Sequence, residues 1–357
     1  MTEEDDGRSD FADAGRRKDR GSMSDGLTPT PPAKAVELYL NQREPEVSEK
    51  TYQNHQYRLK QFLAFCSDHE INDMNRLTGR NIHRFRVWAS QDVEPVTLRG
   101  YLQTFRVFLE FCAAIDAVEP GMRESVQIPE VEPEDEARDE HLEASRAESI
   151  LEYLEQFAYA SREHVVTAIL WHTGIRLGTL RSFDVGDFDR DAQCLDVRHR
   201  PETGTPLKNK KAAERSIAVG PHYCDVIKDY ITHNREKVTD SHGRRPLITS
   251  SQGRLSEGSI RETIYRVTQP CEFGDCPHGK DPKTCKHRRH GQRAGCPSSR
   301  SPHAIRRGSI TNHLRTGSPQ EVVSDRANVS GDILDKHYDE RTEREKMELR
   351  REFIDGL

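Results

Sequence analysis

Apolar residues recur at helical spacing through most of the first third of the chain. The segments with this spacing are 33–40, 48–66, 78–88 and 97–112. Ser48 stands at the start of the second segment, where its hydroxyl can cap a helix that runs to Cys66. About four helices with short connections predict a small helical domain over residues 28–127.

The second half of the chain mixes helical and strand-like patterns. An apolar helix is predicted from Val165 and ends at Gly174, because glycine is the usual residue after a helix C-terminus. Two β-like segments, 194–198 and 215–219, flank a lysine-rich turn. We therefore predict a mostly α fold with a small antiparallel β-sheet, in which a mixed α/β domain occupies residues 144–340.

Charge and composition mark the ends of these domains. Residues 1–27 are rich in Asp, Arg, Gly and Ser and are predicted to be disordered. Residues 130–143 hold eight acidic residues and one basic residue, so the stretch 128–143 is predicted to be an exposed acidic linker. The last segment, 341–357, is predicted to be a charged C-terminal tail.

The net charge of −6 hides a basic region. Residues 271–316 contain ten Lys or Arg residues against three acidic ones, which is the electrostatic pattern of a phosphate-binding surface. The N-terminus lacks the pattern of a secretory signal, and no apolar run approaches membrane-spanning length. These features predict a cytoplasmic protein that binds nucleic acid and no membrane.

An ordered set of polar residues in the second half indicates phosphodiester chemistry. The set comprises Arg176, a lysine cluster at 208–211, His303 with Arg306, and Tyr338. Arginine forks can hold the non-bridging oxygens of a phosphate, a lysine can protonate the leaving hydroxyl, and tyrosine can be the nucleophile. Such a set can break a phosphodiester without a metal ion.

The His-x-x-Arg pattern by itself says little, because it occurs five times in the chain. Only His303 and Arg306 follow a Ser-Pro pair, in which Ser301 can cap a helix and Pro302 fits its first turn. Residues three apart on that helix share a face. A tyrosine, Tyr338, follows at a suitable distance, and we therefore assign this pair to the site.

With these residues in this order, the chain resembles the tyrosine recombinases, or phage integrases, over roughly residues 30–340. The nearest likeness is to archaeal integrases that carry a cysteine-rich insert. The resemblance implies that Tyr338 attacks a scissile phosphate to give a 3′-phosphotyrosine, while Arg176, His303 and Arg306 stabilise the transition state. It also implies double-stranded DNA with specific recombination sites as partner, and a homotetramer acting on two such sites.

The resemblance implies further DNA contacts. Residues 28–127 resemble the core-binding domain of integrases, in which Arg58, Arg86 and Arg99 are candidate phosphate contacts, as are Lys210 and Lys211 in the second half. In the family, the hairpin around residues 207–214 carries the general-acid lysine. Lys208 and Lys210 both fit, and Lys208 is preferred because it is expected at the strand end.

Two positions depart from the family pattern. Many members place an acidic residue three positions after the first arginine, where this chain has Thr179. Members usually have Gly-His before the last serine, where this chain has Asn328 and Val329. The auxiliary His or Trp that contacts the phosphate is thus missing, and either Asn328 replaces it as a donor or the site has one donor fewer.

Four of the eight cysteines fall within residues 271–296. In a cytoplasmic protein, clustered cysteines favour a metal over disulfides. Cys271, Cys276, Cys285 and Cys296 are therefore predicted to bind a structural zinc in an insert, with no cofactor needed for catalysis. The alternative is four free or redox-paired cysteines.

Two other functions fit the same residues. A type IB topoisomerase-like enzyme would use the same chemistry to relax DNA as a monomer. A non-catalytic zinc-containing DNA-binding regulator would have lost the auxiliary donor together with its activity. One-site against two-site strand exchange, and covalent trapping on nicked DNA, separate these possibilities.

Overall fold

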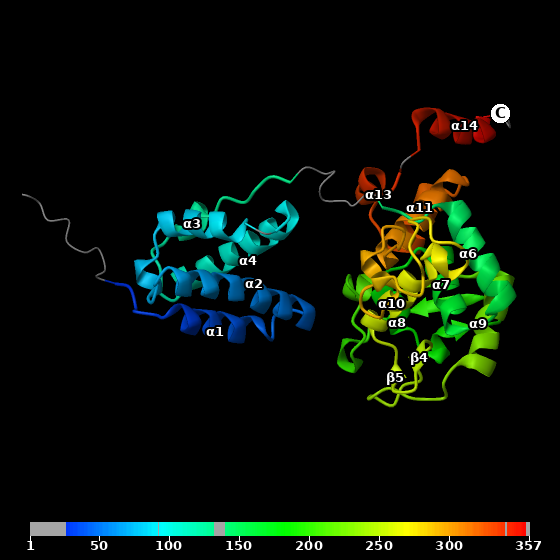
Figure 1. The fold of residues 1–357 in the computed structure, drawn as a ribbon, viewed down its shortest axis with the longest axis horizontal. Coiled ribbons are helices and arrows are strands. Elements are labelled where there is room, and N and C mark those ends of the chain that lie inside the picture. Colours follow the sequence, from blue (N-terminus) through cyan, green and yellow to red (C-terminus); the bar gives the residue numbers. More distant parts are fainter. Residues whose placement is uncertain (1–25, 92, 132–139, 340, 355–357) are drawn as a thin grey trace, which may run out of the picture. The chain divides into compact units, whose positions relative to one another are not determined.

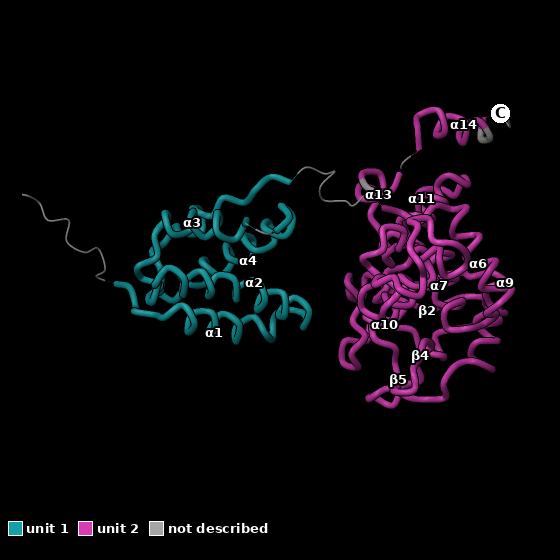
Figure 2. The backbone as a smooth tube through the Cα atoms, in the orientation of Figure 1, with its two compact units in different colours: residues 1–138 teal, residues 139–357 magenta. Residues whose placement is uncertain are grey.

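The computed structural model describes residues 26–91, 93–131, 140–339 and 341–354. The chain divides into two compact units, residues 1–138 and 139–357 (Figure 2). The division falls within the stretch predicted to be an acidic linker, half of which, residues 132–139, lies outside the described residues. Residues 1–25 of the N-terminal segment predicted to be disordered also lie outside them. The described helices include none with the length and apolar character needed to cross a bilayer.

The described part of unit 1 is a bundle of four α-helices (Figure 1). Its α-helices are α1 (Pro32–Arg43), α2 (Glu49–Asp68), α3 (Gly79–Ala89) and α4 (Pro95–Ala114), with short 3₁₀ turns at Met74–Arg76 and Met122–Ser125. The predicted cap is confirmed, since the Ser48 hydroxyl accepts a hydrogen bond from the Thr51 N–H at 3.3 Å. Aromatic rings fill the bundle, and the Phe62 and Phe105 rings lie 4.6 Å apart at its centre.

Unit 2 packs helices around one central helix and a small antiparallel sheet. Its first half contains α6 (Ala144–Phe157), α7 (Arg162–Thr173), α8 (Leu177–Ser182), β1 (Phe188–Asp189), β2 (Cys194–Val197), β3 (Arg215–Ala218) and α9 (Gly220–Asp229), which a π-turn at Tyr230–Asn234 extends. Its second half contains β4 (Thr249–Ser250), β5 (Gly253–Arg254), α10 (Glu257–Val267), α11 (Pro302–Arg315), α12 (Gln320–Ala327), α13 (Gly331–His337) and α14 (Glu343–Ile354).

The predicted hairpin is confirmed in its two strands. The sheet order is β1-β2-β3, and β2 pairs antiparallel with β3 so that Leu195 faces Ile217. Alternate residues of these strands point into the core and the others face outward. The fold is therefore mostly α with a small antiparallel sheet, as the sequence predicted.

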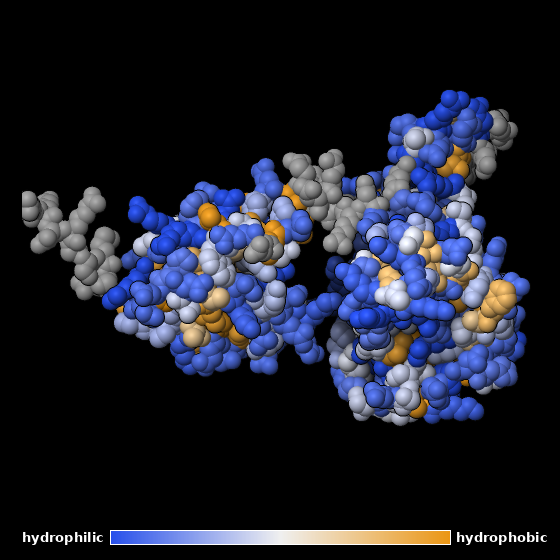
Figure 3. Space-filling view, in the orientation of Figure 1, coloured by the Kyte–Doolittle hydropathy of each residue, from blue (hydrophilic) through white to orange (hydrophobic). Residues whose placement is uncertain are grey.

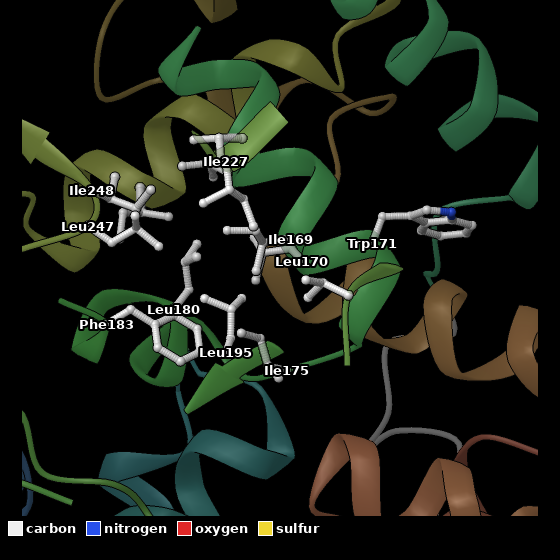
Figure 4. Packing of buried hydrophobic residues seen from close by; sticks show 14 of the residues in the cluster. Ile169, Leu170, Trp171, Ile175, Leu180, Phe183, Leu195, Ile227, Leu247 and Ile248 are labelled. Carbon is white, nitrogen blue, oxygen red and sulfur yellow. The ribbon is translucent and has the colours of Figure 1, made fainter. Parts of the chain in front are cut away.

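Helix α7 is buried along most of its length and forms the centre of unit 2. Its side chains Ile169 and Leu170 pack with Leu180, Leu195 and Ile227 from the surrounding elements (Figure 4). The outer surface is mainly hydrophilic on the face that Figure 3 shows. An apolar helix can hold this central place because no side of it has to meet water.

A second helix, α11, approaches the core closely through a glycine. A Cβ atom added at Gly308 would lie 2.0 Å from the Leu142 carbonyl oxygen and 3.1 Å from the Trp171 ring. Only a residue without a side chain allows this contact between α11, α7 and the segment that leads into α6. The same packing fixes the N-terminus of α11 relative to the end of α7.

A buried ion-pair network anchors the base of the β2–β3 connection. Asp184, which follows α8, accepts from Arg244 Nε at 2.8 Å and from Arg254 Nη2 at 2.5 Å. Asp187 accepts from Arg200 Nη1 at 2.9 Å. Arg200 begins the connection between the two strands, so these bonds hold the start of the lysine-rich turn to the body of unit 2.

Candidate active site

The N-terminus of α11 presents His303 and Arg306 on one face, as their spacing predicted. The Ser301 hydroxyl accepts from the Ala304 N–H at 3.1 Å, and Pro302 occupies the first turn, which confirms the predicted cap. His303 is exposed, whereas Arg306 is only 2 % exposed. The helix thus places one imidazole at the surface above a buried guanidinium.

The guanidinium of Arg306 is bonded on one side only. Its Nη1 donates to the carbonyl oxygens of Gly174 at 2.6 Å and of Ala327 at 2.7 Å. Its Nη2 is buried and has no hydrogen-bond partner among the described residues. Burying a cationic donor without a partner costs free energy of folding, so this nitrogen is suited to bind an acceptor from a ligand.

Arg176 stands beside Arg306 at the junction of α7 and α8. Gly174 ends α7 in the left-handed conformation, with φ 61°, which confirms the predicted stop. Arg176 then occupies the position directly before α8. Arg176 Nη1 donates to the carbonyl oxygen of Asn328 at 2.9 Å. Burial and the nearby charge of Arg306 lower the pKa of Arg176, while Tyr338 acts in the opposite direction, which places both residues within electrostatic reach.

A third arginine, Arg215, joins this cluster and was not predicted from the sequence. Its Nε and Nη2 donate to the carbonyl oxygen of Arg326 at 3.2 and 2.9 Å, and its Nη1 donates to Ala213 at 2.8 Å. Burial, followed by the charge of Arg306, lowers the pKa of Arg215 to about 10. Three of its five N–H groups bond backbone carbonyls, so Arg215 is held in position and adds positive charge to the cluster.

The three arginines are held by one helix end. The carbonyls of residues 326, 327 and 328, at the C-terminus of α12, accept from Arg215, Arg306 and Arg176 in that order. Carbonyls at a helix C-terminus lack intrahelical partners and carry the negative end of the helix dipole. Among the described residues, no carboxylate forms an ion pair with any of the three arginines. Their positive charge therefore remains available to an anion.

Tyr338 lies against this cluster directly after α13. It is 7 % exposed, and its carbonyl accepts from the Thr311 hydroxyl at 3.0 Å. Its ring lies edge-on to the His303 ring, with 6.5 Å between centroids, and the Arg306 guanidinium carbon lies 5.9 Å from its centre. Elements far apart in sequence thus bring one tyrosine, one histidine and two arginines together.

The environment of His303 is strongly cationic. Partial removal from water, and then the charges of Arg306, Arg307, Arg176 and Lys208, lower the pKa of His303 below its usual 6.5. The imidazole is therefore neutral at neutral pH and can accept or donate one hydrogen bond.

Lys208 is the turn lysine whose charge acts on His303. The prediction that it sits at a strand end is wrong. Strand β2 ends at Val197 and β3 begins at Arg215, and Lys208 lies in an exposed turn between them. Lys210 adopts φ 51° and starts a 3₁₀ turn, and with Lys211 it is also exposed. Strands β2 and β3 of the hairpin are each four residues long, so the chain leaves the sheet before it reaches the lysines.

The two departures from the family pattern have a structural explanation. Thr179 is buried, and Arg176 instead takes a backbone carbonyl as its support. Val329 is 6 % exposed and packs in an apolar cluster with Leu334 and Tyr338, so it offers no donor. Asn328 adopts φ 52°, a left-handed conformation that asparagine tolerates better than most residues, and its side chain accepts from Asn209 Nδ2 at 3.1 Å.

The arginines predicted to contact DNA in unit 1 differ in their surroundings. Arg58 of α2 donates to the Thr104 hydroxyl at 3.0 Å and lies over Gly100, where an added Cβ would be 2.9 Å from its Nη2. It therefore helps to join α2 and α4. Arg86 on α3 and Arg99 on α4 are half-buried.

The residues of the cysteine insert, which the sequence predicts to bind a structural zinc, are half-buried or exposed. The described residues contain no group of three or more His, Cys, Asp or Glu side chains that could hold a metal ion. Polar contacts organise the insert, since Arg288 donates to the Cys271 carbonyl and pairs with Glu272 at 2.9 Å, while Arg293 pairs with Glu262 of α10 at 2.6 Å. The side chains of Cys276, Cys285 and Cys296 are half-buried, and the arrangement does not gather the four thiols that were predicted to bind zinc.

Comparison with known proteins finds similarity to integrases and recombinases. Residues 37–115 match the family "Phage integrase, N-terminal SAM-like domain". A Sinorhizobium fredii protein named as an integrase/recombinase is 31 % identical over 98 residues, which cover 27 % of this chain and 28 % of that protein. A Methanocaldococcus jannaschii protein named as an integrase/recombinase is 21 % identical over 326 residues, which cover 86 % of this chain and 88 % of that protein.

A solved structure extends the similarity in fold to most of the chain. The lambda integrase dimer bound to a COC′ core site superposes with a TM-score of 0.63 at 12 % identity, covering 88 % of this chain and 79 % of that chain. At this identity the superposition establishes a shared fold.

Proposed function

The chain belongs to the tyrosine recombinase family, and from that premise we propose that it is a site-specific DNA recombinase that works through a covalent tyrosine intermediate. The Tyr338 oxygen attacks a scissile phosphate, a bond forms between that oxygen and phosphorus, and the bond from phosphorus to the 5′-oxygen breaks. The phenol proton passes to neutral His303, and Lys208 donates a proton to the leaving 5′-oxygen. The 3′-phosphotyrosine keeps the bond energy, so the 5′-hydroxyl of another strand can reseal the DNA.

The observation that carries this proposal is the one-sided bonding of Arg306. Its Nη1 is fixed by two carbonyl oxygens, and its buried Nη2 has no partner beside the Tyr338 ring. A fixed guanidinium edge is suited to a phosphate oxygen, because preorganised donors stabilise the charge that develops in the transition state. Arg176 and Arg215 add positive charge on the same helix end.

The proposal includes DNA as the partner and a tetramer as the active assembly. The structural neighbour is described as a dimer on a core site, and two DNA sites with two protomers each require four copies of the chain. The exposed Lys208, Lys210 and Lys211 are then close to the DNA backbone, where lysines act as mobile phosphate contacts.

Covalent trapping tests this function. Purified protein is incubated with duplex DNA nicked beside the scissile bond, so that the short 5′-hydroxyl fragment diffuses away and resealing is blocked. A denaturation-resistant protein–DNA adduct is expected, and Tyr338→Phe should abolish the adduct while DNA binding is retained, because one hydroxyl adds little to a phosphate-dominated interface. Tyr159→Phe, which removes an exposed hydroxyl distant in sequence from the site, is the matched control and should form the adduct normally.

The outcome separates the function from its rivals. An adduct that persists in Tyr338→Phe removes Tyr338 from the nucleophile role, and no adduct with any substrate leaves a DNA-binding protein without cleavage. Exchange between two DNA sites identifies a recombinase, whereas relaxation of a supercoiled plasmid without exchange identifies a topoisomerase.

A further inference from the structure

A side-chain hydrogen bond connects the two halves of the candidate site. Asn209 Nδ2 donates to Asn328 Oδ1 at 3.1 Å, although the residues are 119 positions apart. Asn209 lies between Lys208 and Lys210 in the exposed turn, and Asn328 follows the last turn of α12. The bond therefore joins the lysine turn to the helix end that holds the arginines.

Asn328 makes two contacts of different kinds. Its backbone carbonyl accepts from Arg176 Nη1 at 2.9 Å, and its side-chain oxygen accepts from Asn209. The left-handed backbone at this position, with φ 52°, is one that glycine would adopt without strain. The amide side chain is therefore not required by the backbone conformation, which gives it a role separate from ending α12.

The lysine turn has little else to position it. Residues 208–211 are exposed, and their other hydrogen bonds to described residues are backbone contacts within residues 207–214. Within the described parts of the chain, the Asn209–Asn328 bond is the one hydrogen bond that fixes residues 208–211 to a distant element. Leu207 and Ala213 bury the two ends of the turn, whereas the exposed residues between them include the lysine whose approach to the leaving oxygen needs a defined geometry.

We infer that Asn328 is a positioning residue that, through Asn209, holds the lysine turn against the arginine cluster so that Lys208 reaches the leaving 5′-oxygen. This inference rests on the proposed recombinase function. It also gives Asn328 a role other than that of a donor to the phosphate. Covering the site with DNA would exclude water from this bond and so strengthen the restraint.

A change of leaving group tests the inference. In DNA with sulfur in place of the bridging 5′-oxygen at the scissile phosphate, the departing thiolate needs no proton, so cleavage no longer depends on the general acid. Asn328→Gly keeps the backbone conformation and removes the amide, and Asn209→Ala removes the other partner. Each variant should cleave ordinary DNA about 3- to 30-fold more slowly, which is less than the roughly 10²- to 10⁴-fold that loss of the acid itself costs.

With the sulfur substrate, both variants should cleave within about two-fold of the wild-type rate. The double variant should lose no more than either single variant, because the two residues act through one bond. Gln252→Ala, an exposed amide on the β4–β5 turn, is the control and should behave as wild type on both substrates.

Three results would overturn the inference. One is normal cleavage of ordinary DNA by Asn328→Gly. Another is an equal loss on both substrates, which would indicate that Asn328 contacts the phosphate. The third is an additive loss in the double variant. Failure of the wild-type protein to cleave either substrate would instead reject the proposed function, so the two failures remain distinct.

Discussion

The guanidinium carbon of Arg306 lies 5.9 Å from the centre of the Tyr338 ring, within one structural unit and 32 positions apart in sequence. A cation at this distance favours the negative charge that develops on the phenol oxygen during attack. Because Arg306 is fixed by carbonyls from both α7 and α12, the position of the charge depends on packing among three helices. A substitution of Arg306 is therefore expected to affect both DNA cleavage and the packing of these helices.

Replacing Arg306 or Arg176 by lysine should lower single-turnover cleavage by about 10²-fold or more. An ammonium carries the same charge but cannot bond backbone carbonyls on one edge and a phosphate on the other. DNA affinity should change little, because many other residues are expected to contact the DNA phosphates. Arg190→Lys, at an exposed position on the β1–β2 turn, is the control and should cleave normally. Full activity in either site variant would remove that arginine from the site.

Gly308→Ala should destabilise unit 2 by about 1–3 kcal/mol. The added methyl would meet the Leu142 carbonyl oxygen, which belongs to backbone and cannot move without shifting the segment before α6. Gly258→Ala in α10, where the nearest atom lies 3.7 Å away, is the matched control and should be neutral or slightly stabilising. Urea denaturation of both variants measures the difference, and equal stability would show that α11 has room at this point.

Local features of the site could be predicted from sequence because their causes are local. The caps at Ser48 and Ser301 and the glycine stop at Gly174 depend on residues within one helical turn. The pairing of residues 194–198 with 215–219 followed from strand propensity on both sides of a turn. Each of these is present in the structure.

The support of the arginines could not be predicted in the same way. Arg215, Arg306 and Arg176 donate to backbone carbonyl oxygens. Every residue carries such a carbonyl, so the sequence does not indicate which of them will lie beside the arginines. The Asn209–Asn328 bond depends on how α12 packs against the turn. The only local signal was Asn328 itself, since an asparagine after a helix indicates a left-handed conformation.

We propose that zinc draws Cys271, Cys276, Cys285 and Cys296 together, although these thiols form no metal-binding group among the described residues of the structure. Elemental analysis of purified protein should then find about one zinc per chain. The reason is chemical, because a short polar insert with four cysteines has no core of its own to stabilise it. Cys276→Ser should then lose the metal and lower the melting temperature, while Cys224→Ser, at a buried thiol outside the insert, should keep the metal. Protein without zinc but with normal melting would show that the Arg288 and Arg293 contacts suffice to hold the insert.

Acid should destabilise the protein through His172. The ring of His172 stacks on Tyr223 with 4.0 Å between centroids, and burial, followed by the charges of Arg326 and His313, lowers the pKa of His172 to about 3. The unfolded chain takes up this proton near pH 6.5, whereas the folded protein does not, so stability is lost as the pH falls from 6.5 toward 3. The free energy of unfolding then falls with a slope that approaches about 1.4 kcal/mol per pH unit, or by about 2 kcal/mol between pH 6.5 and 5.

His172→Phe keeps an aromatic ring against Tyr223 and removes the titration, so its free energy of unfolding should fall less steeply. His233→Gln, at an exposed position, should follow the wild type. Urea denaturation at pH 7, 6 and 5 measures these slopes, and parallel curves for wild type and His172→Phe would show that His172 is not the group that resists protonation.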